Sequence, residues 1–418
     1  MHADRLADQR HVGHAVGVAQ GLRHGRVLPS FAREAPPAGV RLRRGVPPVS
    51  VWRSTRTARK PIGGRVPEGD LRGPEESVQL DWPSVRTYLA RHGLRFDRDP
   101  PPRQFAGGLA NLNYLIYLDG KPAVLRRPPM GELPVGAYDM AREHRILSRL
   151  PDALPFVPRS FHLCDDVSVC GQRFQILEYR PGLVIRETVP PDLAARPGFG
   201  ERVSGVLLET IAAIHAVDTK AIGLDDLGRP EGFLARAVSG WTKRGWSAKE
   251  DGTDALHKDI GAWLEKNIVP EGPPSLLHND FKLNNIILNP EDLSPVGVVD
   301  WDQGTRGDPL FDFCTLLSYW IHPTDPWAMH DMKQMPAVEV GLCPRREAVA
   351  AYAKITGRDV SNILFHRVIT MYKLSVIFLQ LGFRYRSGAT TEPRYAPLTA
   401  IGTGILEFTH EIAQGRAF

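Results

Sequence analysis

Residues 278–285 read HNDFKLNN, an H-x-D-x-K-x-x-N pattern. A short apolar stretch and a polar turn follow, and then a second apolar run, Val296–Val299, which ends at Asp300. This order predicts a polar loop, a short hairpin and an acid carried out on the second strand of the hairpin. The hairpin would bring Asp280, Asn285 and Asp300 to one small site.

These residue types suit phosphoryl transfer. The proton of an acceptor hydroxyl must pass to a carboxylate, for which Asp280 is the candidate. A triphosphate brings Mg²⁺, which prefers oxygen ligands, and Asn285 and Asp300 offer an amide oxygen and a carboxylate. Lys282, two residues after the candidate base, can reach a transferring phosphate as a point charge. The alternative interpretation is a polar surface turn beside a buried strand.

The stretch from His278 to Asp312 resembles the aminoglycoside phosphotransferase/choline kinase family, and in particular the kinase domains fused to acyl-CoA dehydrogenases. The resemblance extends from about Val78 to the C-terminus. Asn279 departs from the family pattern, which usually has Gly there, and Asn284 stands where an acid often precedes the Asn. The resemblance implies an α+β, protein-kinase-like fold, with a small lobe of five antiparallel strands and one key helix before a mainly helical lobe.

A glycine turn precedes the first long strand of the expected small lobe. Gly107 and Gly108 allow close approach of the backbone to a phosphate, although by themselves they predict only a turn. Together with Asn111 they resemble the loop with which the family covers its nucleotide. Ala110 replaces the Ser that the family often has, so any hydroxyl contact with phosphate from that position is absent.

The third strand of the fold normally carries a cation that pairs with nucleotide phosphates. Arg126 is the candidate, on the strand that follows an Asp-Gly hairpin turn. The resemblance pairs it with Glu143 on a helix expected over residues 138–150, and the alternative is a solvated Glu on a surface helix. Glu178 ends the small lobe, where the family's connector meets the adenine through its backbone.

Other elements follow from hydrophobic periodicity. His215, at the end of one expected helix, is assigned to packing. Trp241 and Trp246 lie where related kinases have a helical insert that shapes the acceptor pocket, and they fit a core role equally well. Strands are expected at residues 156–164 and 170–178, and helices at residues 81–92, 199–215, 230–246 and 363–381.

Three further acids lie downstream of the hairpin. By resemblance, Asp308 braces the 278–285 loop through hydrogen bonds, and Asp312 caps or anchors the next helix. Asp302 is close enough to Asp300 to touch a second Mg²⁺, but an outward-facing position is an equal alternative.

The positive charge of the chain is concentrated near its N-terminus. Residues 1–73 hold fourteen Lys and Arg against five Asp and Glu, which gives them a net charge of +9. The whole chain has a net charge of +5, so the remaining residues carry −4. Residues 1–75 are rich in Arg, Pro and Gly, which predicts a disordered extension or a translation start assigned too far upstream. We therefore expect the folded part to bind no nucleic acid.

Membrane and metal-cluster classes are disfavoured. No run approaches the ~20 apolar residues that span a bilayer, and charges interrupt the segment 363–381, which fits a buried amphipathic helix better. The four cysteines are scattered and complete no zinc pattern, so free thiols in the cytoplasm are expected. They are Cys164, Cys170, Cys314 and Cys343.

The sequence thus predicts a nucleotide-binding lobe over residues 78–182 and a catalytic and acceptor-binding lobe over residues 183–418. ATP, or alternatively GTP, and Mg²⁺ are the expected cofactors, and the partner is a small molecule with a hydroxyl acceptor. The branch resemblance points to a hydroxyacyl thioester or a related metabolite. The alternatives are an aminoglycoside-type antibiotic kinase, a protein kinase without a visible activation segment, and a nucleotide-binding pseudoenzyme. The sequence leaves the oligomeric state open.

Overall fold

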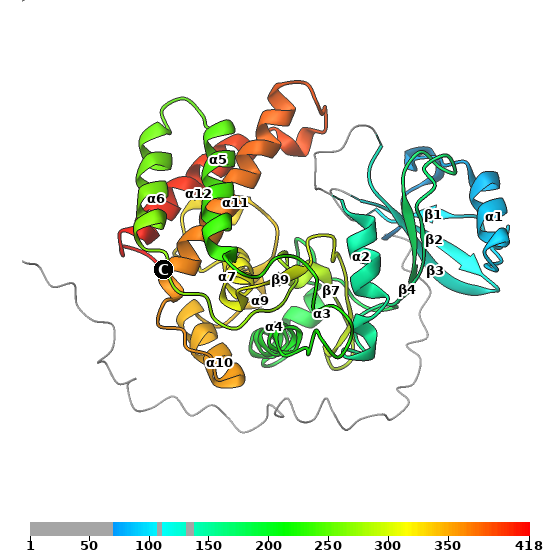
Figure 1. Cartoon of the computed structure of the whole chain (residues 1–418), viewed down its shortest axis with the longest axis horizontal. Coiled ribbons are helices and arrows are strands. Elements are labelled where there is room, and N and C mark those ends of the chain that lie inside the picture. The colour runs from blue at the N-terminus through cyan, green and yellow to red at the C-terminus, as the bar shows by residue number, and fades with distance from the viewer. Residues whose placement is uncertain (1–69, 107–110, 131–137) are drawn as a thin grey trace, which may run out of the picture. The chain divides into compact units, whose positions relative to one another are not determined.

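The computed structural model describes residues 70–106, 111–130 and 138–418 (Figure 1). Nearly all of the extension expected over residues 1–75 lies outside the described residues. The described chain forms an antiparallel sheet with flanking helices, followed by a mainly helical part. The fold class expected from the sequence is therefore confirmed.

The sheet lobe comprises β1 to β5 with helices α1 and α2. Its five strands are antiparallel and run in the order β1-β2-β3-β5-β4. Its elements are η3 (Pro74–Glu76), α1 (Trp82–Arg91), β1 (Arg103–Gln104), β2 (Leu112–Leu118), β3 (Lys121–Arg127), α2 (Met140–Leu147), η4 (Leu150–Asp152), β4 (Ser160–Cys164) and β5 (Phe174–Glu178).

The hairpin between β2 and β3 forms as its sequence predicts. Asp119 and Gly120 both have positive φ, of 50° and 73°. Two consecutive residues of this kind make the tight turn whose twist matches paired strands. The register of the hairpin places Asn113 opposite Arg126.

The two faces of the sheet contact different helices. On one face, Ile116 and Leu125 are buried in one cluster with Val85 and Leu89 of α1. Because successive side chains of a strand point to opposite faces, Arg126 lies on the face that carries α2. This alternation explains why one strand can serve both the core and a polar site.

The helical lobe comprises α3 to α12 and four short strands. The strands form two small sheets, β6 with β9 and β7 with β8. Its elements are α3 (Pro191–Ala194), α4 (Phe199–His215), α5 (Phe233–Ser247), α6 (Asp254–Lys266), β6 (Ser275–Leu277), η5 (Leu283–Asn285), β7 (Ile286–Leu288), β8 (Pro295–Val298), β9 (Thr305–Gly307), α7 (Pro309–Tyr319), α8 (Trp327–Asp331), α9 (Ala337–Val340), α10 (Arg345–Thr356), α11 (Ile363–Arg386), η6 (Pro393–Tyr395) and α12 (Leu398–Ala413).

Most element boundaries agree with the sequence to within a few residues. Helix α4 covers the expected residues 199–215, and the Asp81 carboxylate caps α1 by accepting the N–H of Ser84 at 3.0 Å. Strands β4 and β5 begin four residues later than expected. The residues before them form turns, which apolar content alone does not distinguish from strand.

Helix α11 is long and apolar enough to cross a membrane, but most of it is buried within the helical lobe. Residues 365–376 are buried without a break, in agreement with the buried helix expected from the sequence. Its neighbours α7 and α12 cover it. It is therefore a core helix, and the charged side chains within it need partners.

Candidate active site

The 278–285 loop, which contains η5, connects β6 to β7, and a buried carboxylate fixes it. Asp312, in the first turn of α7, accepts the backbone N–H of His278 at 2.7 Å and that of Asn279 at 2.8 Å. His215 Nε2 lies 3.2 Å from the same carboxylate. Although burial opposes ionisation, these partners lower the pKa of Asp312. The loop is therefore bound to the start of α7.

The roles expected for Asp308 and Asp312 are reversed in the structure. Asp308 caps α7, because its carboxylate accepts the N–H of Leu310 at 2.8 Å, and Pro309 occupies the first helical position. An Asp-Pro pair is a typical helix start, so the sequence held this signal. Asp312 lies one turn further on and braces the loop. His215 is buried against Asp312 and Tyr352, in agreement with a packing role.

Asn279 adopts the left-handed conformation, with a φ of 64°. Asn tolerates this region better than most residues with a side chain, and Gly tolerates it best. The departure from the family pattern thus preserves the turn. The side-chain Nδ2 of Asn279 also donates to the carbonyl of Gln303 at 3.0 Å.

Asp280 lies among three polar side chains. Lys282 Nζ is 3.1 Å from Oδ2, and the Tyr319 hydroxyl donates to Oδ1 at 3.1 Å. Asn285 Nδ2 donates to the Asp280 carbonyl at 2.8 Å. Burial disfavours the charge on Lys282, but Asp280 and Tyr319 outweigh it and raise its pKa. The Lys282 ammonium and the Asp280 carboxylate therefore lie side by side.

The β7–β8 hairpin brings Asn285 and Asp300 together, as the sequence predicts. Ile286 pairs with Val298, and the N–H of Val299 donates to the Asn285 carbonyl at 3.0 Å. Asp300 is the next residue, with a φ of 70°. The Nδ2 of Asn285 donates to Asp280, so the amide oxygen of Asn285 is turned away from Asp280. An amide oxygen and a carboxylate oxygen are ligands that suit Mg²⁺ together with phosphate and water oxygens.

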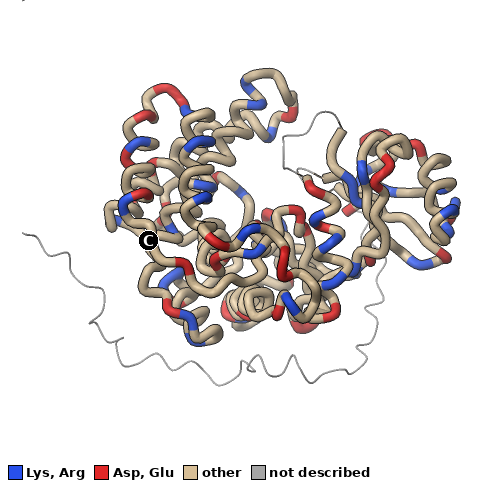
Figure 2. Tube along the Cα trace, in the orientation of Figure 1, with Lys and Arg blue, Asp and Glu red and all other residues tan. Residues whose placement is uncertain are grey.

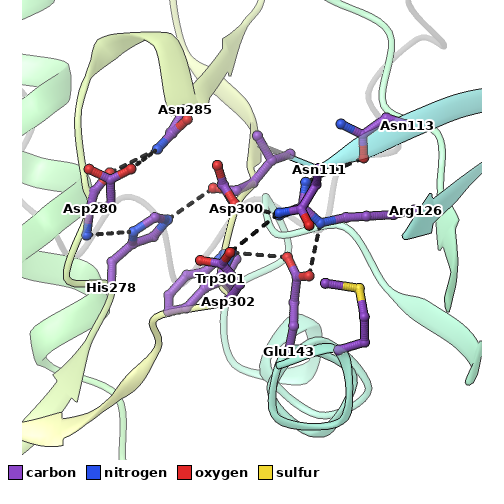
Figure 3. A network of polar contacts seen from close by, with 12 residues as sticks. Asn111, Asn113, Arg126, Glu143, His278, Asp280, Asn285, Asp300, Trp301 and Asp302 are labelled. Atoms are coloured by element: carbon purple, nitrogen blue, oxygen red, sulfur yellow. Dashed lines mark hydrogen bonds and ion pairs between the residues drawn. The ribbon is translucent and has the colours of Figure 1, made fainter. Parts of the chain in front are cut away.

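Arg126 is the centre of the polar network in Figure 3. Its Nε donates to Glu143 Oε2 at 2.9 Å, one Nη donates to Asn113 Oδ1 at 3.3 Å, and the other pairs with Asp300. Burial opposes the charge, but the acids outweigh it and raise the pKa of Arg126. The expected Arg126–Glu143 contact is therefore present. Gln175 also donates to Glu143, at 2.7 Å.

Glu143 also connects α2 to the residues after the hairpin. Its Oε1 accepts the backbone N–H of Trp301 at 3.1 Å, and its side chain is fully buried. The alternative of a solvated surface Glu is therefore wrong. One carboxylate contacts both the cation of β3 and the backbone beside Asp300.

Asp302 points toward the sheet lobe. Its Oδ2 accepts a hydrogen bond from Asn111 Nδ2 at 3.3 Å, which joins the start of β2 to the residues after the hairpin (Figure 3). Burial, with the nearby charge of Asp300, raises the pKa of Asp302 to about 8. Of the two positions expected for Asp302, the structure has the inward one.

The other predicted residues lie apart from this network or outside the described chain. Gly107 and Gly108 fall outside the described residues. The Glu178 side chain accepts hydrogen bonds from the Arg159 N–H and from Arg180, at 3.1 and 2.9 Å. Its carboxylate is thereby engaged, and its backbone N–H donates to the Arg159 carbonyl at 2.8 Å.

Two side chains near Asp280 were missed by the sequence reasoning. Tyr319 lies at the end of α7, with the Lys282 ammonium 4.7 Å from its ring centroid. Lys373 of α11 donates to the Asn279 carbonyl at 2.8 Å. The signal available in the sequence was a lysine among the charged residues that interrupt a mostly apolar segment.

The charge at this site is local. Figure 2 shows Lys and Arg interspersed with Asp and Glu over both lobes. Side chains that touch Asp280 and Asp300 therefore decide the electrostatics there, since distant exposed charges are screened.

A sheet lobe joined to a helical lobe, with an acid, a lysine and an asparagine on the loop between strands, defines a kinase-like phosphotransferase. The chain belongs to the phosphotransferase enzyme family, abbreviated APH, whose sequence model matches residues 102–350.

The curated relatives are longer proteins. Acyl-CoA dehydrogenase family member 10 of Mus musculus is 29% identical over 276 residues, which are 66% of this chain and 25% of that protein. Acyl-CoA dehydrogenase family member 11 of Gallus gallus is 27% identical over 352 residues, 80% of this chain and 42% of that protein. The chain thus spans less than half of either relative, and the expected branch of the family is confirmed.

Solved structures share the fold. A Ralstonia eutropha protein, provisionally described as an aminoglycoside phosphotransferase, has a TM-score of 0.66 and 23% identity, covering 81% of this chain and 99% of that one. Aminoglycoside phosphotransferase APH(4)-Ia, in a ternary complex with ADP and hygromycin B, has a TM-score of 0.51 and 16% identity, covering 78% and 98%. At these identities the likeness concerns the fold alone.

Proposed function

We propose that this protein transfers the γ-phosphate of ATP to a hydroxyl group of a small molecule. The observation that carries the proposal is the convergence of Arg126 and Asp300, which lie 174 residues apart in sequence and form an ion pair. A phosphate-binding cation and a metal-binding acid must meet in this way at a triphosphate. In this proposal residues 78–182 bind the nucleotide, and residues 183–418 carry the catalytic and acceptor-binding groups.

Asp280 is proposed as the group that orients the acceptor hydroxyl and takes its proton. The Tyr319 hydroxyl and the Lys282 ammonium hold its carboxylate, so one orientation is favoured before the acceptor arrives. Lys282 and Arg126 would neutralise the charge on the transferring phosphate. Glu143 keeps Arg126 in place from the opposite side.

Asn285 and Asp300 would hold Mg²⁺. The Asn285 amide is turned by its hydrogen bond to Asp280, which leaves its oxygen for a cation, and Asp300 is partly exposed. A bound ion would offset the negative charge of the phosphates. The oxygen-only donor set supports Mg²⁺ over a softer metal.

The acceptor is proposed to be a hydroxyacyl thioester or a related metabolite. The matched relatives are named as acyl-CoA dehydrogenase family members, and this supports an acyl substrate. Lys282 and Lys373 both lie near Asp280, so a polycationic aminoglycoside would meet repulsion there. Two arginines of the helical lobe contribute little to attracting an anionic acceptor, because Arg345 is paired with Asp325 and Arg386 with Glu250.

All four cysteines carry free thiols, which supports the proposed cytoplasmic location.

The proposal is tested by measuring phosphate transfer from labelled ATP to hydroxyacyl-CoAs, aminoglycosides, choline and sugars. Asp280→Ala is the blank, because it should remove turnover while MgATP still binds. A product that the blank also forms would refute the role of Asp280. Binding of MgATP without any product across the panel would favour the pseudoenzyme alternative.

A further inference from the structure

Lys373 is a buried cation that the proposed reaction does not use. It lies in α11 among consecutive buried residues, and the residue is 6% exposed. Burying an ammonium group is costly unless it is paired or hydrogen-bonded. None of the ion pairs within 4.0 Å among the described residues includes Lys373, so another contact must compensate.

That contact is with the 278–285 loop. Lys373 Nζ donates to the Asn279 carbonyl at 2.8 Å and lies 5.4 Å from the ring centroid of Phe311. The face of α11 that carries it is docked on α7, since Thr370, one turn earlier, donates to the Cys314 carbonyl at 3.1 Å. The packing of α11 on α7 therefore fixes the position of the Lys373 ammonium group.

The Asn279 residue is held at both of its backbone polar groups. Its N–H donates to Asp312 of α7, and its carbonyl accepts from Lys373 of α11, each at 2.8 Å. Asn279 has a positive φ and directly precedes Asp280. A residue in this sparsely populated region persists when its surroundings specify it, so both contacts set the direction in which the chain enters Asp280.

We propose that Lys373 is a positioning residue, which orients Asp280 by fixing the carbonyl of Asn279. The inference rests on the proposed function of Asp280, but the hold on the loop exists independently of the reaction. The charges that face Lys373 are Asp280 and Lys282 from the loop, Asp312 from α7 and Arg244 from α5. Burial together with the two cations lowers the pKa of Lys373 to about 8, against the opposing effect of the two acids.

The test compares Lys373→Met, Lys373→Arg and the control Lys243→Met, an exposed lysine of α5, in the full chain. Amide hydrogen exchange is measured by mass spectrometry on peptides that cover residues 276–286, α7 and α11. In Lys373→Met, exchange in the 276–286 peptide should rise by about tenfold while α7 and α11 stay protected. The control should leave all three peptides unchanged.

Turnover of any acceptor that the panel above identifies gives a second readout. Lys373→Met should lower kcat by about 10- to 100-fold and change KM for MgATP by less than about threefold, because misplacing a reacting group affects the chemical step. Lys373→Arg should restore part of the rate, since a guanidinium can also donate to the carbonyl. Unchanged exchange in the 276–286 peptide, or an equal rise in all three peptides, would overturn the proposal. A different result would separate the two proposals. If Asp280→Ala retains turnover while Lys373→Met raises exchange only in the 276–286 peptide, the proposed role of Asp280 is wrong, but Lys373 still holds the 278–285 loop.

Discussion

Arg126 of β3 and Asp300 after β8 form an ion pair that joins the sheet lobe to the β7–β8 hairpin (Figure 3). The cation expected to bind phosphate is therefore paired with the acid expected to bind metal. Burial opposes ionisation of Asp300, but Arg126, with His278 and Lys282, lowers its pKa. When a metal–triphosphate complex binds, Arg126 could pair with phosphate and Asp300 with the metal ion. Neither side chain would then be left as an unpaired charge.

Replacing Arg126 with Lys should weaken MgATP binding. The guanidinium donates to Glu143, Asn113 and Asp300 from three nitrogens, and an ammonium group cannot span all three. We expect KM for MgATP to rise by about tenfold, which corresponds to about 1.4 kcal/mol. Titration calorimetry with MgATP and steady-state rates would measure the effect. Arg173→Lys, at an exposed ion pair with Asp165, should bind as the unaltered chain does.

Asp300→Ala should reduce MgATP binding more than it reduces binding of ATP in the presence of EDTA. The substitution removes the carboxylate proposed for the metal but leaves the Arg126–Glu143 contact intact. Titrations with and without Mg²⁺ measure this difference. If the variant kept the full Mg²⁺ dependence of binding, Asp300 would not be a ligand.

Asp312→Asn and Asp308→Asn are a matched pair of variants. The first tests the contact of Asp312 with the 278–285 loop, and the second tests the cap of α7 by Asp308. Both oxygens of Asp312 accept backbone N–H groups of the 278–285 loop, and an amide offers one acceptor where two are needed. We expect this variant to lose about 2–4 kcal/mol of unfolding free energy and most of its turnover.

Asp308→Asn should cost less, because Asn caps helices nearly as well as Asp. Its unfolding free energy should fall by about 1–2 kcal/mol because the carboxylate beside His366 Nε2, 3.3 Å away, is lost. Urea denaturation and steady-state rates measure both variants. Equal losses of turnover would contradict the separation of roles.

Local sequence patterns predicted the elements that carry the site. The β2–β3 turn follows from Asp-Gly, and the meeting of Asn285 with Asp300 follows from a short hairpin between two apolar runs. The cap at Asp308 could also have been recognised from Pro309. What failed there was the assignment of roles to two acids four residues apart, since sequence spacing does not show which one turns back toward the loop.

Two side chains near Asp280, Tyr319 and Lys373, could not be placed there from the sequence. Tyr319 lies 39 residues after Asp280, and Lys373 lies 94 residues after Asn279. Both are delivered by the packing of α7 on α11, and pairings of this kind are tertiary. A lysine within a buried helix signals that a partner exists but does not identify it.

Tyr319→Phe should lower kcat while leaving the fold stable. The substitution keeps the ring beside Lys282 and removes the hydroxyl that donates to Asp280 Oδ1. Losing one hydrogen bond to a charged group should cost about 1.5–3 kcal/mol of orientation, or about 10- to 100-fold in kcat. Rates at saturating MgATP test this expectation. A normal kcat would mean that Lys282 and Asn285 suffice to hold the carboxylate.

His257 should make the stability of the helical lobe depend on pH. Its ring is fully buried, Nδ1 lies 2.8 Å from the Tyr372 hydroxyl, and Nε2 has no hydrogen-bond partner among the described residues. Burial lowers its pKa from 6.5 to about 4. The unfolded chain therefore binds a proton between these values that the folded chain does not, and stability must fall as the pH falls through this window.

Above pH 6.5 this imidazole has no effect on the unfolding free energy, because it is neutral in both the folded and the unfolded chain. Between pH 6.5 and about 4, the unfolding free energy should fall by up to about 3 kcal/mol. Unfolding free energies measured between pH 7 and 4 should fall less steeply in His257→Gln than in the unaltered chain, because Gln cannot be protonated in this range. His92→Gln, at an exposed position after α1, is the control and should retain the full slope. Parallel curves for His257→Gln and the unaltered chain would show that the buried imidazole is not the titrating group.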